Sequence, residues 1–541
     1  MPERTATQEI QEIPLKIVGG TRFGRYPKIS VENTTNMIIS DGALVPYSGW
    51  KNVISVESSS LGRALYASFT GDLMIAVIGN GVYRIIQPLI PTSMSIFQST
   101  LVGSLATSEG DVYIAENTSK QICITDSVNI YVYNYDDGTF KSSAPGGGIP
   151  TWTTFFPNTN PGYISFQNGR LIIALENTQR WVLSAFNDAL TWSDTAPFVG
   201  TLQSKPCTIK AVVPVPGGGN NVLVFGTTVA ESWQDLGLAL FPYQRNSTFN
   251  LDYGCLNASS IAELDNFVVW LGANEQSGPT IMVTGGNGVQ SISTDGIDFV
   301  LAQLTNPTNC TGFLFRQDGH LLYQFSFPDD NITFAYDFNN KEFSTITDDT
   351  FNYHPAREVV FFNGSYYFVS LKDGNIYQFD TKYTNAIYSD DDIREIPRVR
   401  ITPPLRFNTQ RYFIGKSLAF TIENGEKNIK TTTTINANEL ADTIATEVPA
   451  TLLTEDGFEL AVENSEAFTY STLSEAVDLS ISRDGGQTFG NAWRNEMNLT
   501  GNRKSRFIYQ RLGIANDASF LLQFCGFGRF VVFDGIVEAY E

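Results

Sequence analysis

The chain has 541 residues, of which 42% are hydrophobic and 13% aromatic, while only 17% are charged. The aromatic content excludes a disordered chain, and the abundance of Thr, Ser, Asn and Gly favours strands and turns over helices. With 35 basic against 56 acidic side chains the net charge is −21, which disfavours a protein that binds nucleic acid through phosphate contacts. We therefore expect a large folded β protein whose acidity serves solubility, or keeps DNA from adhering to it.

Cysteine and histidine are too sparse to predict a metal site, a disulfide framework or a histidine-based catalytic centre. The five cysteines are odd in number and form no C-x-x-C pair, so buried free thiols are expected. The two histidines, His320 and His354, are expected to be structural, which leaves no material for a catalytic triad. The first 20 residues lack an apolar signal core, and no apolar run approaches the ~18 residues of a membrane span. We expect no cofactor, no metal and no membrane-spanning segment, in a chain made in a reducing cytoplasm.

Residues 1–60 contain an extended, turn-rich stretch that predicts an N-terminal arm with irregular strands. From residue 61 to 395 one pattern recurs: an apolar strand, a turn of Asn, Asp or Gly, an alternating strand, and a strand rich in Tyr and Val. Asn-Gly and Asp-Gly turns between alternating runs are the strongest short signal for a β-hairpin. The copies span 64–86, 104–124, 163–183, 211–233, 261–274, 312–327 and 358–380.

Repeated four-stranded units of about 40–50 residues are typical of β-propellers. A single such sheet leaves an apolar face uncovered, so the units must stack around an axis to close a core. We therefore predict an all-β fold with a propeller of six to seven blades over residues 61–395. The alternative is a string of unrelated hairpins in a sandwich.

Residues 396–541 predict a second β region, which begins at a cluster of prolines. Together with residues 1–60 it is expected to form a β-sandwich-like platform, because neither segment alone has enough alternating strands to close a core. Removal of residues 1–60 should then destabilise the C-terminal domain. An insertion near 425–470 carries a predicted short helix, which Asn436 can cap and Pro449 ends.

The most specific short motif is SISRDGGQTFGNAW at 480–493, which matches the Asp-box hairpin of sialidase-like propellers. We expect Asp484 to accept hydrogen bonds from its own turn, the two glycines to adopt positive φ, and the following aromatic ring to be buried. We predict that this turn is structural and binds no ligand. Its residues are Ser482, Asp484, Gly486, Thr488 and Phe489.

The same motif raises an alternative function, a carbohydrate-binding or glycosidase-type propeller. A glycosidase needs two positioned carboxylates, or a tyrosine nucleophile with an arginine cluster, and a sequence does not show that geometry. In sialidases the box itself is structural and lies away from the catalytic centre. An intracellular propeller used as an interaction scaffold is a third possibility. We predict no enzyme activity and no catalytic residue.

A longer pattern covers residues 222–294: a strand ending in Phe-Gly, then E-x-W, a strand that starts with glycine, and a glycine-led strand closing in Ile-Ser-Thr. The opening NTTNMIISDGALVPYSGW and the ending over 482–524 add to it. These segments resemble, in the same order, the packaged-DNA stabilisation proteins of short-tailed bacteriophages, also called tail hub or nozzle proteins. The insertion near 425–470 departs from the compact members. The principal matching positions are Gly226, Glu231, Trp233, Gly254, Gly272, Ser293 and Thr294.

The resemblance implies a structural virion protein that does no chemistry. It implies a homo-hexameric tail nozzle that extends the channel of the portal and adaptor rings, retains packaged DNA and conducts it during ejection. The implied partners are the head–tail adaptor ring, tail fibres or spikes, a channel plug or needle, and DNA bound without sequence specificity in the lumen. The implied location is the phage tail, after assembly in the host cytoplasm.

Overall fold

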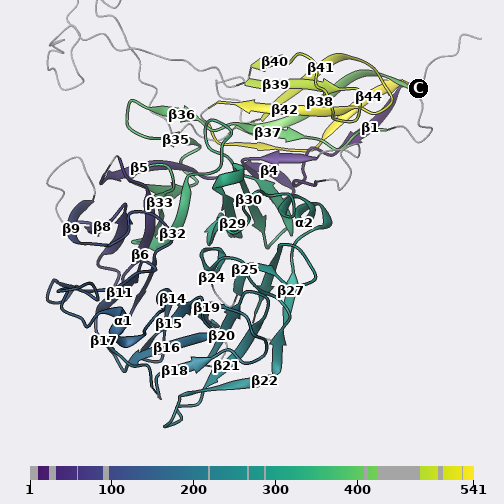
Figure 1. Ribbon diagram of the computed structural model, residues 1–541. Coiled ribbons are helices and arrows are strands. Elements are labelled where there is room, and N and C mark those ends of the chain that lie inside the picture. Colours follow the sequence, from purple (N-terminus) through teal and green to yellow (C-terminus); the bar gives the residue numbers. More distant parts are fainter. Residues whose placement is uncertain are drawn as a thin grey trace, which may run out of the picture.

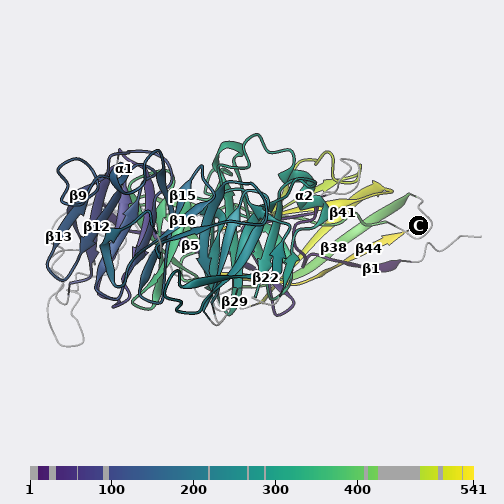
Figure 2. The same ribbon diagram turned by 60° about the horizontal axis from the view of Figure 1, so that its bottom comes forward.

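The computed structural model describes residues 10–540 except 24–31, 58, 89–96, 196, 217–219, 265–266, 286–287, 407–411, 425–475, 497–503 and 527. The described chain is almost entirely β structure, arranged as a ring of sheets below a second, flatter region (Figures 1 and 2). The predicted helix near residue 440 lies outside the described residues. No helix of the described chain is long and apolar enough to cross a membrane.

The first four blades follow the chain in order, each as an antiparallel meander. The first contains β6 (Gly62–Ala67), β7 (Met74–Ile78), β8 (Gly81–Ile86) and β9 (Gln98–Ser104), and the second β10 (Tyr113–Glu116), β11 (Gln121–Thr125), β12 (Ile130–Asn134) and β13 (Thr139–Ser142). Helix α1 (Trp152–Phe155) leads to the third, which contains β14 (Asn160–Gln167), β15 (Arg170–Glu176), β16 (Arg180–Ala185), β17 (Asp188–Trp192) and β18 (Val199–Thr201). The fourth contains β19 (Ile209–Pro214), β20 (Asn221–Gly226), β21 (Ala230–Asp235) and β22 (Tyr243–Leu251).

The last three blades are less regular, because short helices and strands from elsewhere enter them. The fifth contains β23 (Gly254–Cys255), η1 (Ala258–Ser260), β24 (Ala262–Leu264), β25 (Phe267–Ala273), β26 (Thr280–Thr284) and β27 (Val289–Ser291). After α2 (Asp295–Leu301) the sixth contains β28 (Thr311–Gln317), β29 (His320–Phe327), η2 (Pro328–Asp330), β30 (Ile332–Asp337) and β31 (Glu342–Thr345). The seventh contains β32 (Ala356–Phe362), β33 (Ser365–Ser370), β34 (Asn375–Asp380) and β5 (Gly49–Ser55), with β35 (Asn385–Ile387) and β36 (Ile393–Glu395) outside them.

The ring is closed by contacts between the first strands of successive blades. Strand β6 contacts both β10 and β32, and β28 contacts β32 in turn. Across the described residues this gives seven sheets around one axis, with hydrophobic clusters packed between neighbouring blades. The predicted all-β class and propeller are confirmed, and the sandwich of unrelated hairpins is wrong.

Strand β5 shows where the predicted boundary at residue 60 differs from the structure. We placed residues 1–60 outside the propeller, but β5 pairs antiparallel with β34 and supplies the fourth strand of the seventh blade. Trp50 on this strand is fully buried, with its ring 4.8 Å from that of His354. The pairing of β5 with β34 brings the two ends of the propeller segment into one blade and so closes the ring. The repeat pattern alone did not indicate this closure.

The second region, which we call the platform, is built from both ends of the chain. One sheet has the order β1 (Gln11–Leu15), β44 (Gly535–Tyr540), β38 (Phe413–Asn424), β43 (Phe530–Val532), β4 (Ala43–Pro46) and β3 (Met37–Ser40), with β41 (Lys504–Ala515) also paired with β38. The other continues from β31 of the sixth blade through β2 (Asn33–Thr35), β37 (Arg398–Ile401), β42 (Ser519–Cys525), β39 (Ala476–Ser482) and β40 (Trp493–Glu496). A hydrophobic cluster drawn from both sheets forms their common core.

Arg400 ties the N-terminal segment to this core. Its guanidinium is completely buried and donates to the carbonyl of Ile17 at 2.6 Å, to the hydroxyl of Thr34 at 3.0 Å, and to the carboxylate of Glu32 at 2.5 Å. A buried charge is tolerated only when its donors are paired, so these acceptors fix Ile17, Glu32 and Thr34 against β37.

We expect Trp50→Ala to lower the free energy of unfolding by about 3–5 kcal/mol, since it removes a fully buried aromatic side chain from the closing strand. Urea denaturation of the purified chain measures this change. Phe361→Ala in the same blade is the control: Phe361 is 59% exposed, and its removal should change stability by no more than about 0.5 kcal/mol. Equal effects of the two substitutions would contradict the closing role of β5.

Candidate functional site

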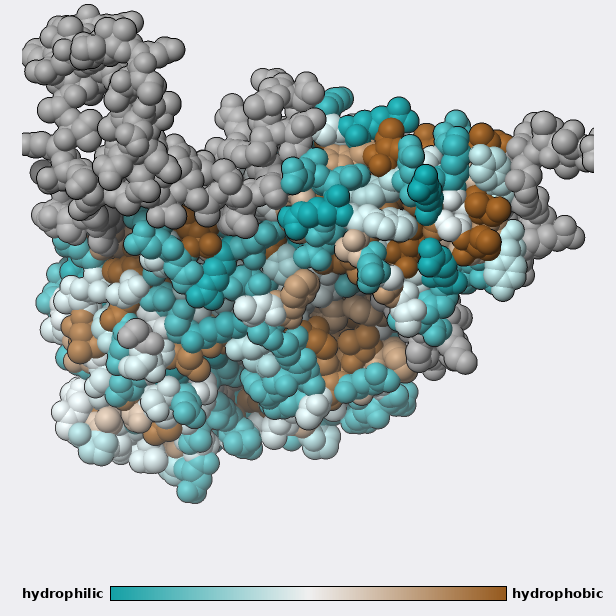
Figure 3. Space-filling view, turned by 90° about the horizontal axis from the view of Figure 1, so that it is seen from above, coloured by the Kyte–Doolittle hydropathy of each residue, from teal (hydrophilic) through white to brown (hydrophobic). Residues whose placement is uncertain are grey.

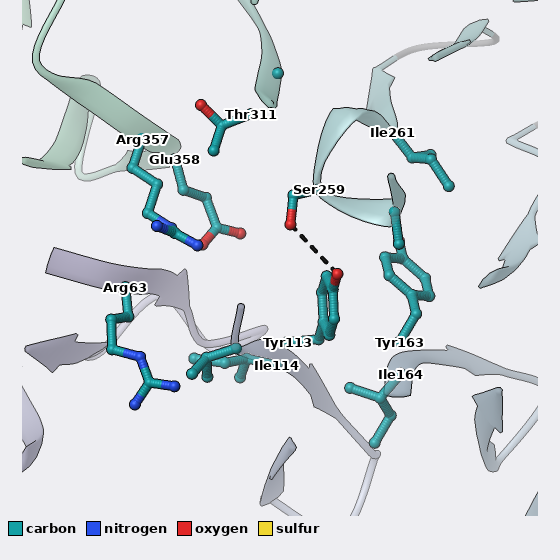
Figure 4. Close-up of a pocket in the computed structure, with 13 residues that line it drawn as sticks. Arg63, Tyr113, Ile114, Tyr163, Ile164, Ser259, Ile261, Thr311, Arg357 and Glu358 are labelled. Atoms are coloured by element: carbon teal, nitrogen blue, oxygen red, sulfur yellow. Dashed lines mark hydrogen bonds between the residues drawn. The ribbon is translucent and has the colours of Figure 1, made fainter. Parts of the chain in front are cut away.

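One concavity of the propeller lies on its axis, where the innermost strands meet (Figure 4). It has a volume of about 120 Å³ and is lined from β6, β10, β14, β28, β32 and the segment around η1. Arg357, Glu358 and Thr311 approach it from one side, and Tyr113 and Tyr163 from the other (Figure 4). Polar and apolar side chains therefore converge on one small space.

Most charged groups of this cavity are already paired with protein. Arg357 donates to Asp111 at 2.7 Å, and Ser259 donates to the hydroxyl of Tyr113 at 3.3 Å. Arg63 donates all of its N–H groups to residues in the loops next to the first blade, four of them to carbonyl oxygens. Glu358 accepts from the backbone N–H of Leu65 at 2.9 Å. These bonds join blades one, two, five and seven across the axis.

The cavity is small compared with known ligand sites. Its volume is about 120 Å³, whereas pockets for drug-sized ligands take roughly 300–1,000 Å³. Among the residues that the structure describes, no group of three or more His, Cys, Asp or Glu side chains is arranged to hold a metal ion. The axial cavity therefore does not have the size of a pocket for a drug-sized ligand.

Glu231, one of the motif residues in the fourth blade, is a fully buried carboxylate. It accepts from the backbone N–H of Gln203 at 2.8 Å, from the backbone and the hydroxyl of Ser204, and from the indole of Trp233 at 2.9 Å. The Nε of Arg245 lies 3.4 Å away. The E-x-W motif thus anchors the loop between the third and fourth blades to β21, which is a structural role.

The remaining motif residues are spread over blades four and five and form no common site. A Cβ on Gly254 would collide with the backbone of Thr227, and Gly226 and Gly272 are similarly crowded by neighbouring side chains. Ser293 accepts from the backbone N–H of Ile281 at 2.8 Å, and Thr294 caps α2, a helix that we did not predict. Close packing and capping account for these residue types.

The Asp-box lies in the loop between β39 and β40 of the platform. Asp484 accepts from the hydroxyl of Ser482 at 2.6 Å, from the hydroxyl of Thr488 at 2.6 Å, and from the backbone N–H of Thr488 at 3.0 Å. These bonds hold the pKa of the Asp484 carboxyl below its usual range. The two glycines, including Gly486, have φ of 75° and 91°. Phe489 is only partly buried, because this loop lies at the surface.

The structure brings together one arrangement that the sequence analysis did not expect. His320 lies 2.9 Å from Asp337 through Nδ1 and 3.1 Å from the hydroxyl of Ser40 through Nε2. The three residues have the hydrogen-bond connectivity of a Ser-His-Asp triad. No such arrangement was expected from the sequence, because the chain has only two histidines. Asn340 donates both to Asp337 and to the carbonyl of Ile39. The bonds attach the β3–β4 turn to the sixth blade, and only the tertiary fold makes the three residues neighbours.

The other histidine and the cysteines are structural. Burial lowers the pKa of His354 to about 3, and its Nδ1 accepts from the backbone N–H of Ala356. All five cysteines are free. Three are buried as expected, whereas Cys207 and Cys525 are partly exposed.

A family model described as bacteriophage P22 Gp10, β-propeller, matches residues 29–384, which is more than half of the chain. The chain belongs to this phage family. The matched range runs from the segment before β2 to the end of the seventh blade, so it includes the closing strand β5. The family is one of phage structural proteins. A comparison with curated protein sequences found no match.

Several solved structures match this chain at low similarity. A chain of a mitotic checkpoint complex has 11% identity and a TM-score of 0.38, covering 63% of this chain and 95% of its own. A virginiamycin B lyase from Staphylococcus aureus has 11% identity and a TM-score of 0.39, covering 60% and 98%. The N-terminal domain of Nup159 has 10% identity and a TM-score of 0.37, covering 64% and 98%.

Glu358 predicts a pH dependence of stability. Its side chain is exposed to the axial cavity, and desolvation inside the ring of blades raises the pKa of its carboxyl from 4.5 to about 7. The folded chain then binds this proton more tightly than the unfolded chain, so its stability falls as the pH rises from about 4.5 to about 7. We expect Glu358→Gln to raise Tm at pH 8 and to change it little at pH 4.5. A variant with the same pH profile as the wild type would contradict this assignment.

Glu231→Ala should destabilise the propeller strongly, because each buried donor left unpaired costs on the order of 1–3 kcal/mol. The measurement is chemical denaturation of the full chain. Glu275→Ala is a matched control, since this carboxylate is 62% exposed and forms only a long ion pair with Lys205 at 3.9 Å. If both variants unfold at the wild-type denaturant concentration, Glu231 does not anchor the loop.

Proposed function

We propose that this chain is a virion protein of the phage tail that forms a hexameric nozzle or hub. In this role it extends the portal–adaptor channel, retains packaged DNA and conducts it during ejection. Membership of the phage family supports the structural role, and the resemblance of the three segments noted above suggests the nozzle. Its partners are then the head–tail adaptor ring, tail fibres or spikes, and a channel plug or needle.

The observation that carries the proposal is the narrow axis of the propeller. A cavity of about 120 Å³, crossed by hydrogen bonds between blades, is far too small for a nucleic-acid strand. A passage for DNA must therefore lie between several copies of the chain. Closed rings are the usual outcome when identical subunits associate through two different surfaces.

The charge of the chain suits such a passage. DNA that must move cannot be held by many lysine and arginine contacts, because each phosphate contact adds salt-dependent affinity. The propeller segment 61–395 has 32 acidic against 15 basic side chains, so an acidic wall is available to face the lumen. The proposal needs no cofactor and no metal, and places the mature protein in the virion after assembly in the host cytoplasm.

Electron microscopy of the purified protein, alone and with its adaptor ring, tests the proposal. We expect six-fold rings whose central opening admits double-stranded DNA and whose inner wall is mainly acidic. Particles without rotational symmetry would contradict the nozzle. A lumen lined mainly by lysine and arginine would contradict the interpretation that the acidic charge keeps DNA from adhering to the wall.

The Asp-box favours one second candidate, a carbohydrate-binding or glycosidase-type propeller. The hydrogen bonds of Asp484 within its own turn argue for a structural role there. Asp484→Asn separates the candidates: the nozzle proposal expects any effect to fall on folding and assembly. A stable, fully assembled variant that had lost a glycan-cleaving activity of the wild type would favour the enzyme.

A further inference from the structure

Ser40, His320 and Asp337 form a hydrogen-bonded chain at the border between the platform and the sixth blade. The Nδ1 of His320 lies 2.9 Å from a carboxylate oxygen of Asp337, and its Nε2 lies 3.1 Å from the hydroxyl of Ser40. Because a carboxylate only accepts hydrogen bonds, Nδ1 carries the proton of the neutral imidazole. Nε2 then accepts the hydroxyl proton of Ser40. This is the tautomer that a general base needs in order to activate a serine.

The imidazole and the carboxylate are held in place by the sixth blade. The side chains of His320 and Asp337 are only 10% and 6% exposed. Asp337 accepts two further hydrogen bonds, from the backbone N–H of Asn339 at 2.8 Å and from the side chain of Asn340 at 2.7 Å. Asn340 also donates to the carbonyl of the residue before Ser40. The imidazole is therefore oriented toward the serine before any substrate binds, as a catalytic base must be.

Ser40 itself is accessible. It is the last residue of β3 and is partly exposed, and the two residues of the turn that follows, Asp41 and Gly42, are exposed. A Cβ added to Gly42 would meet no atom within 4 Å, so the turn projects into open space. Among the described residues, the backbone N–H groups of Asp41 and Gly42 donate to no acceptor. In serine hydrolases the N–H after the nucleophile stabilises the negative oxygen of the reacting carbonyl, and this turn has such donors.

We propose that Ser40 is the nucleophile of a hydrolytic site for small acyl esters, with His320 as general base and Asp337 as the residue that orients it. The hydroxyl oxygen of Ser40 forms a bond to the acyl carbon while its proton passes to Nε2. The bond between the acyl carbon and the alcohol oxygen then breaks, and the alcohol leaves with that proton. Water next attacks the acyl group on Ser40, a proton returns through Nε2 to the serine oxygen, and the carboxylic acid is released.

The surroundings of the three residues favour a short acyl group on a polyhydroxylated carrier. Asp41, Asn339 and Asn340 are exposed beside them and offer carboxylate and amide groups, which bind hydroxyls. Hydrophilic residues also predominate on the face of the molecule that Figure 3 shows, where hydrophobic residues form separate patches. A long acyl chain needs a continuous apolar groove, whereas an acetyl group does not. We therefore assign acetate esters of polyols as the substrate class.

The test is covalent labelling of the purified full chain with a fluorophosphonate, which reacts with activated serines. We expect a label on the peptide that contains Ser40, and hydrolysis of glycerol triacetate above the rate in buffer. Ser40→Ala should abolish both, and His320→Gln should slow labelling at least tenfold. Ser365→Ala is the matched control and should retain both, because Ser365 is also partly exposed beside a two-residue turn but accepts from Gln378.

Mapping the label on the wild-type chain keeps the test valid if a variant does not fold. An unlabelled Ser40 in the folded wild type, or labelling at the wild-type rate in folded His320→Gln, would overturn the inference. The three residues would then only attach the turn to the blade. A labelled Ser40 without hydrolysis of glycerol triacetate would contradict the assigned substrate class. All of these results leave the proposed nozzle standing, because it does not depend on this activity.

Discussion

Closure of the ring of blades is the constraint on which the rest of the structure depends. The seventh blade has three strands from residues 356–380 and takes its fourth, β5, from residues 49–55. The paired strands bury Trp50 against His354, in a cluster that also contains Phe368 and Phe379. Because the chain must return to its own beginning to complete this blade, the pairing of β5 with β34 also holds the N-terminal segment at the end of the propeller segment.

The same N-terminal segment joins the propeller to the platform. Strand β2 pairs parallel with β31 of the sixth blade and antiparallel with β37 of the platform, so one continuous sheet passes from one region to the other. Arg400 holds the adjoining residues through buried hydrogen bonds, and the Ser40–His320–Asp337 chain attaches the next turn to the sixth blade. A force on the platform is therefore transmitted directly to the propeller, as the proposed role in retaining packaged DNA requires.

The repeated blades and the local turns could be predicted from the sequence. Turns such as Asp318-Gly319 and Asn363-Gly364 have the positive φ that their residue types favour, and they revealed the blades. The Asp-box bonds could be expected for the same reason, since they lie within one turn. The position of β5, the buried Arg400 and the contact of His320 with Ser40 depend on residues that are hundreds of positions apart or in different repeats. No local pattern encodes such contacts, and the axial cavity is known only once all blades are in place.

Taken together, the narrow axis and the acidic propeller support the proposal that this protein works within an assembly. The most direct test is quantitative mass spectrometry of purified particles of a phage whose genome encodes this chain, combined with antibody labelling in electron micrographs. The account predicts six copies per particle, all at the tail vertex. Absence of the chain from purified particles, or its presence as scattered copies over the capsid, would contradict the account.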